Sequence, residues 1–124
     1  RLMTVKVKEA LNGVNPIVSA DTNLAEAIVK MTEYGFGAIT ITNADGSLKG
    51  VFTDGDLRRK LIADGRDVLN KTMGDFTYNA AISIESDALL NVAAGLFKST
   101  KVDTILVTDN GKPIGMLDIQ DLEA

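Results

Sequence analysis

The sequence predicts a mixed α/β fold of two pseudo-symmetric β-α-β-β-α repeats, whose sheets pack against each other. The main evidence is one pattern that occurs twice, as Gly50-Val-Phe-Thr-Asp-Gly-Asp-Leu57 and as Gly115-Met-Leu-Asp-Ile-Gln-Asp-Leu122. Each copy has a glycine, an apolar pair typical of a strand, and an aspartate-leucine pair that favours the start of a helix. A strand that leads directly into a helix N-terminus presents free backbone N–H groups to an anion. We therefore expect two ligand-binding places, one in each repeat.

Each repeat also contains an amphipathic helix before this pattern. Apolar residues at i, i+3, i+4 and i+7 predict the two helices, at Leu24, Ala27, Ile28 and Met31 and again at Leu90, Ala93, Ala94 and Phe97. Asp21 and Asp87 precede the helices and are candidate N-caps. Gly35 is expected to end the first helix, because glycine readily takes the left-handed conformation.

Strands and turns repeat in the same order around the two helices. Segments rich in β-branched residues predict strands at 38–42 and 104–108, each followed by a turn and a second strand, at 49–52 and 114–117. Short strands are expected before the helices, at 17–18 and 82–84. We assign residues 1–65 to the first repeat, 66–77 to a connector and 78–124 to the second repeat, truncated at its last helix. The chain is interpreted as a piece of a longer protein.

Composition excludes several classes of function. The formal net charge is −4, so no global basic field is present to hold a nucleic acid. No apolar stretch is long enough to span a membrane. The chain has neither cysteine nor histidine, which removes disulfides, thiolate metal sites and the commonest general base. We therefore predict no metal, no cofactor and no enzymatic activity for this fragment, and a cytoplasmic location.

The repeats resemble a tandem CBS-domain pair (Bateman module). The string Phe52-Thr53-Asp54-Gly55-Asp56-Leu57-Arg58-Arg59 is similar to the version found in the C-terminal CBS pair of arabinose 5-phosphate isomerases. This resemblance implies an upstream sugar-isomerase domain in the parent protein, in the pathway to the lipopolysaccharide sugar Kdo. It also implies a disc-shaped homodimer, for which the predicted helices around Leu24 and Leu90 could supply the interface.

Thr53 and Asp56 are the first candidate ligand-binding residues. An ionised Asp56 can accept hydrogen bonds from two vicinal ribose hydroxyls, and the Thr53 hydroxyl with nearby backbone N–H groups suits a phosphate oxygen. The resemblance to nucleotide-binding CBS pairs implies the same roles. The alternative is that both residues only cap the helix, with Thr53 bound to the N–H of Asp56; the two roles are compatible.

Other candidates lie beside this pair. Arg58 and Arg59 suit bidentate binding of phosphate or carboxylate, whereas Lys60 is expected on a solvated helix face. Ile17, which follows Asn15-Pro16, is a candidate apolar contact to a base, although core packing is an alternative role.

In the second copy, Asp121 matches Asp56, but Asp118 stands in the position of Thr53. A carboxylate there repels phosphate, so we expect Asp118 to cap a helix and the second cleft to be empty or to take a ligand without phosphate.

The leading hypothesis is a regulatory module that binds a nucleotide or nucleotide-sugar, such as CMP-Kdo or an adenine nucleotide, and modulates the absent isomerase domain. The alternative is an oligomerisation and interaction module without a physiological ligand. An enzyme is the third possibility, but no pair of acidic or basic residues is spaced convincingly for proton abstraction.

Overall fold

The computed structural model describes residues 2–11, 16–35 and 37–123. The chain divides into two compact units, one formed by Asn15–Ala80 and the other by Arg1–Val14 together with Ala81–Ala124. Each unit contains one three-stranded sheet, with strand order β1-β2-β3 in the first and β4-β5-β6 in the second. The predicted mixed α/β class with two sheets is confirmed, and each unit is described separately below.

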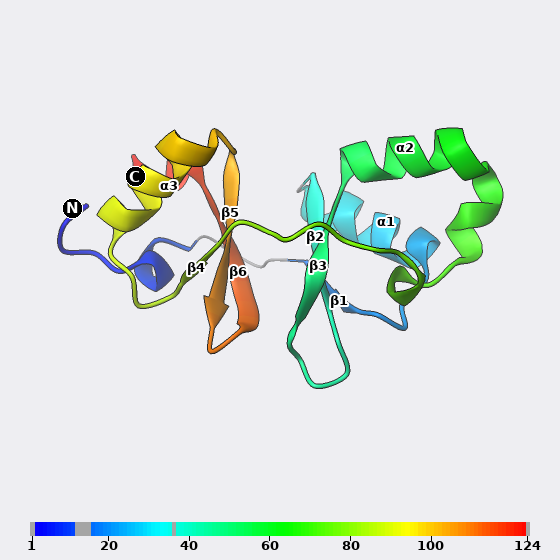
Figure 1. Ribbon diagram of the computed structural model, residues 1–124, viewed down its shortest axis with the longest axis horizontal. Helices are drawn as coiled ribbons and strands as arrows, with labels where there is room; N and C mark the ends of the chain where they lie inside the picture. Colours follow the sequence, from blue (N-terminus) through cyan, green and yellow to red (C-terminus); the bar gives the residue numbers. More distant parts are fainter. Residues whose placement is uncertain (1, 12–15, 36, 124) are drawn as a thin grey trace. The chain divides into compact units, whose positions relative to one another are not determined.

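The unit formed by Asn15–Ala80 has helices on one face of its sheet (Figure 1). Its elements are β1 (Ile17–Ser19), α1 (Leu24–Tyr34), β2 (Ala38–Thr42), β3 (Leu48–Thr53), α2 (Asp54–Asp64) and two 3₁₀ helices (Arg66–Asn70 and Met73–Asp75). Strand β1 runs parallel to β2, and β2 runs antiparallel to β3. The strands and helices predicted for the first repeat are therefore confirmed, with ends that shift by a residue or two.

The N-cap of helix α1 lies two residues after the predicted one. The side chain of Asn23, not Asp21, accepts a hydrogen bond from the backbone N–H of Glu26, at 2.9 Å. The Asp21 prediction was wrong because a cap must lie directly before the first helical residue, which is Leu24. The C-terminal prediction is confirmed, since Gly35 has a φ of 68° and its N–H reaches the carbonyls of the last turn.

The segment after α2 completes the core of this unit. Helix α2 has no fully buried residue. Val68, Met73 and Phe76 instead join the cluster formed by α1 and the sheet, and each is at most 8% exposed. The ring of Phe76 stacks on that of Phe52, with centroids 5.9 Å apart. The segment that the sequence analysis treats as a connector is thus a structural part of the unit, because its apolar side chains cover core surface that α2 leaves open.

Gly50 lets this segment approach β3 closely. A Cβ atom at position 50 would collide with the ring of Tyr78. The Tyr78 hydroxyl donates a hydrogen bond to the carbonyl oxygen of Met73, at 2.7 Å. The first glycine of the repeated pattern therefore has a packing role in this copy.

The second unit has the same order of elements. They are β4 (Ser83–Glu85), α3 (Leu90–Thr100), β5 (Thr104–Asp109), β6 (Lys112–Asp118) and two 3₁₀ helices (Val7–Ala10 and Ile119–Leu122). Strand β4 is parallel to β5, and β5 is antiparallel to β6. The predicted last helix is a 3₁₀ turn over the described residues.

The N-terminal segment packs in this second unit. Val7 and Ala10 are buried in the cluster around α3 and β5, and the N–H of Val7 donates to the carbonyl of Ala88 at 2.7 Å. The sequence division had placed these residues with the first repeat. Asp87, the predicted cap of α3, forms an ion pair with Lys8 at 3.0 Å instead. Its prediction as a cap was wrong because α3 begins at Leu90, and the N-cap Leu89 makes no side-chain bond.

Candidate ligand site at the start of helix α2

Thr53 and Asp56 form a reciprocal cap at the start of α2. Thr53 is the last residue of β3, so the strand leads directly into the helix as predicted. Its Oγ1 accepts a hydrogen bond from the N–H of Asp56 at 3.1 Å, and Oδ2 of Asp56 accepts one from the N–H of Thr53 at 2.9 Å. Both side chains are half-buried. The capping role is therefore confirmed, whereas a contact with a ligand stays a prediction.

Arg59 lies on the other oxygen of the same carboxylate. Its Nη2 donates to Oδ1 of Asp56 at 2.7 Å. Burial alone raises the pKa of the Asp56 carboxyl, but hydrogen bonds from Thr53 and Arg59 outweigh it and hold the pKa below its ordinary value. Asp56 is thus an ionised carboxylate with an adjacent guanidinium, an arrangement that suits a ligand with both hydroxyl groups and a negative charge.

The three consecutive basic residues have three different surroundings. Arg58 is exposed and forms no ion pair with any residue that the structure describes. Lys60 does not lie on a solvated face, as the sequence suggested, because its Nζ is 4.4 Å from the centroid of the Phe76 ring. Of these three basic residues, only Arg59 forms a hydrogen bond with the carboxylate of Asp56.

Ile17 lies at the start of β1 and pairs with Thr40 of β2. It is 37% exposed, so it is not one of the fully buried core residues that its packing alternative implied. Among the described residues, no hydrogen bond joins it to Thr53 or Asp56, and Asn15 lies outside these residues.

The second copy of the pattern also forms a cap. Oδ1 of Asp118 accepts a hydrogen bond from the N–H of Gln120 at 2.9 Å, and the N–H of Asp118 donates to Oδ2 of Asp121 at 2.8 Å. The expected capping role of Asp118 is confirmed. Asp121 thus repeats the contact that Asp56 makes with the backbone, in a 3₁₀ helix rather than an α-helix.

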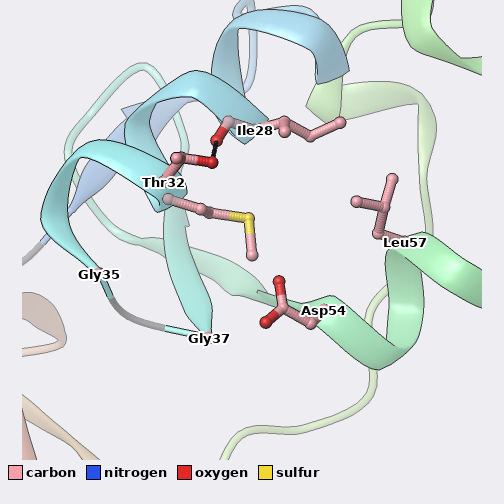
Figure 2. A pocket seen from close by; sticks show the side chains of 7 residues that line it. Ile28, Thr32, Gly35, Gly37, Asp54 and Leu57 are labelled. Atoms are coloured by element: carbon pink, nitrogen blue, oxygen red, sulfur yellow. Dashed lines mark hydrogen bonds between the residues drawn. The ribbon is translucent and has the colours of Figure 1, made fainter.

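Two small pockets lie along α2. One, of about 260 Å³, is lined by Asp56, Arg59, Lys60, Ala63 and Asp64. The other, of about 240 Å³, lies between α1 and α2 and is lined by Ile28, Met31, Thr32, Gly35, Gly37, Asp54 and Leu57. Figure 2 shows the side chains of Asp54 and Leu57 projecting from α2 toward α1. Sequence reasoning missed this second pocket, because α1 and α2 meet there only through the tertiary fold.

Among the residues that the structure describes, no group of three or more acidic residues is placed to hold a metal ion. No helix in the same set is both long and apolar enough to cross a membrane.

Comparison with known proteins identifies relatives by sequence and by fold. The chain is 31% identical over 119 residues to the probable arabinose 5-phosphate isomerase of Haemophilus influenzae, covering 95% of this chain and 35% of that protein. It is 32% identical over 108 residues to the arabinose 5-phosphate isomerase KdsD of Pseudomonas aeruginosa, covering 86% and 33%. The chain thus spans about a third of the length of these curated relatives.

The fold resembles that of the CBS domain protein PAE2072 from Pyrobaculum aerophilum, solved in complex with AMP. The TM-score is 0.78 at 18% identity, covering 94% of this chain and 89% of that one. The family model described as CBS domain matches residues 3–63 and 73–123. With two matched copies in one chain, this protein belongs to the CBS-domain family and is a tandem CBS pair.

Proposed function

We propose that this CBS pair is a regulatory module that binds a nucleotide or a nucleotide-sugar at the start of α2. The observation that carries the proposal is the Asp56 carboxylate, which caps the helix through Oδ2 and meets Arg59 at Oδ1 beside a pocket of about 260 Å³. A vicinal diol suits the carboxylate, and the guanidinium suits a phosphate or carboxylate of the same ligand.

Two classes of ligand fit this chemistry. Adenine nucleotides are supported by the AMP complex of PAE2072, which shares the fold. CMP-Kdo is supported by the isomerase relatives, since a product of the Kdo pathway would be a sensible effector. Both ligands contain a ribose diol and at least one negative charge.

We propose that the module belongs to a longer arabinose 5-phosphate isomerase of lipopolysaccharide biosynthesis in the cytoplasm. The relatives extend well beyond the matched region, so the isomerase reaction is assigned to their remaining part. Ligand binding to the CBS pair would change the activity of the isomerase domain only under one condition. The ligand must bind two conformations of the protein with different affinity.

A second candidate function is assembly of a homodimer without a physiological ligand. Exposed apolar side chains favour it, because Val29 on α1 is 63% exposed, Ile62 on α2 is 86% exposed and Val92 on α3 is 50% exposed. A stable dimer in light scattering, without heat on addition of any ligand, would support this function over the first.

Isothermal titration with CMP-Kdo and AMP tests the leading proposal. Asp56→Ala is expected to abolish binding, and Asp56→Asn to weaken it strongly while it keeps an oxygen for the backbone cap. Asp67→Ala, at an exposed position on the next 3₁₀ helix, is the matched control and should bind as the unchanged chain does. Unaltered binding by both Asp56 variants would remove the site assignment, and absence of heat with both ligands would remove the proposed function.

A further inference from the structure

Arg59 folds back over Gly55 to reach Asp56. A Cβ atom at position 55 would lie 3.2 Å from Nη1 and 3.3 Å from Nη2 of Arg59. Such a contact is tight, so any larger residue at position 55 would press on the guanidinium. The absence of a side chain at Gly55 therefore leaves the space in which Arg59 meets the carboxylate.

The two oxygens of Asp56 are held with unequal strength. Oδ2 accepts the backbone N–H of Thr53, which is fixed by the strand-to-helix turn. Oδ1 accepts from Arg59, whose side chain is 71% exposed, and exposed ion pairs contribute little to stability. A ligand that needs both oxygens can therefore displace Arg59 from Oδ1 at small cost, while the cap at Oδ2 stays in place.

A displaced Arg59 remains beside the pocket. Arg59 and Lys60 line it together with the carboxylates of Asp56 and Asp64. The two carboxylates balance the charge of the two cations, so the pocket has no excess positive charge to hold a bare anion. A ligand that binds Asp56 through hydroxyl groups, in contrast, brings its own anion next to the released guanidinium. The guanidinium offers five donors in a planar fork, which matches phosphate or carboxylate geometry.

We propose that Arg59 is an exchangeable counter-ion of Asp56: ligand hydroxyls displace it from the carboxylate, and it then binds the ligand's anion. This inference rests on the ligand site proposed above and adds its selectivity. A neutral nucleoside loses the Arg59–Asp56 pair without replacement, whereas a nucleotide replaces it. In the second copy, Glu123 and Ala124 follow Leu122 where Arg58 and Arg59 follow Leu57, so the sequence has no arginine at the position that matches Arg59.

The test compares each neutral nucleoside with its 5′-monophosphate by calorimetry, using adenosine with AMP and cytidine with CMP. Arg59→Gln is expected to weaken binding of the preferred monophosphate about tenfold, the typical value of a charge-assisted hydrogen bond. The same variant should tighten binding of the nucleoside up to about fivefold, because the surface ion pair no longer has to be broken. Arg66→Gln removes one positive charge from an exposed position of the same unit and should change neither affinity.

Three results would overturn the inference. One is that Arg59→Gln changes the affinities for the nucleoside and for the monophosphate by the same factor. Another is that Arg58→Gln, and not Arg59→Gln, loses the preference for the monophosphate. The third is no binding of any nucleoside or monophosphate to the unchanged chain, which would also count against the proposed function.

A measurement without ligand tests the Arg59–Asp56 ion pair independently of ligand binding. The pKa of the Asp56 carboxyl, followed by NMR, should rise in Arg59→Gln but not in Arg66→Gln. If the pKa is the same in all of these proteins, the ion pair does not form and the exchange is refuted, even where the nucleotide binds.

Discussion

Replacement of Phe76 by alanine should destabilise the unit formed by Asn15–Ala80 by about 3–4 kcal/mol. Removal of a buried phenylalanine costs about 3–5 kcal/mol through lost burial and the cavity that remains. The lower part of that range applies here, because Phe76 lies at the edge of the core and keeps 8% of its surface exposed. Its stacking on Phe52 and the cation–π contact with Lys60 are lost in the same substitution.

Urea denaturation followed by circular dichroism measures this loss as a lower midpoint. The matched control is Thr77→Ala, an exposed neighbour that should change the free energy of unfolding by less than about 0.5 kcal/mol. A cost below about 1 kcal/mol for Phe76→Ala would refute the conclusion that the segment after α2 belongs to the core. Amide hydrogen exchange of β2 locates the effect, since two compact units need not unfold in one transition.

Three further outcomes are expected. Gly50→Ala should cost about 1–3 kcal/mol in denaturation, because the new methyl group displaces the Tyr78 ring; an unaltered midpoint would contradict the close packing. Asn23→Ala should cost about 1 kcal/mol and Asp21→Ala almost nothing, since only Asn23 caps α1, and equal costs would count against this assignment. Burial, with a smaller contribution from the Asp56 charge, raises the pKa of Tyr78 to about 12. Spectrophotometric titration should therefore show one tyrosine that ionises only at high pH, and Tyr78→Phe should remove this transition. Because the pKa is raised in the folded state, this contribution to stability is present below about pH 10 and is lost as the pH rises toward 12.

The element order was predictable because local patterns encode it. The apolar spacing from Leu24 to Met31 and the β-branched run from Ala38 to Thr42 both coincide with observed elements. The helix start after Thr53 was also predictable, because threonine followed three residues later by aspartate is a capping pattern. The two false caps, Asp21 and Asp87, lie close to real helix starts, where the choice of capping residue depends on backbone geometry that composition does not define.

At the candidate site, the cap formed by Thr53 and Asp56 was predictable, but the surroundings of Lys60 were not. Thr53, Asp56 and Arg59 lie close in sequence, so the helix brings them together. The neighbourhood of Lys60 was not predictable, because Phe76 is distant in sequence and reaches it only through the fold. Packing of the two sheets against each other and homodimer formation remain predictions.

By itself, the sequence determined the two repeats, their order of strands and helices, and the difference between Thr53 in one copy and Asp118 in the other. These features depend on periodicity, turn residues and caps, which act over a few residues. Only the tertiary structure decided that the N-terminal segment packs with the second sheet and that Val68, Met73 and Phe76 complete the first core. The physical reason is that burial depends on which apolar surface remains uncovered, and that is set by contacts between residues far apart in the chain.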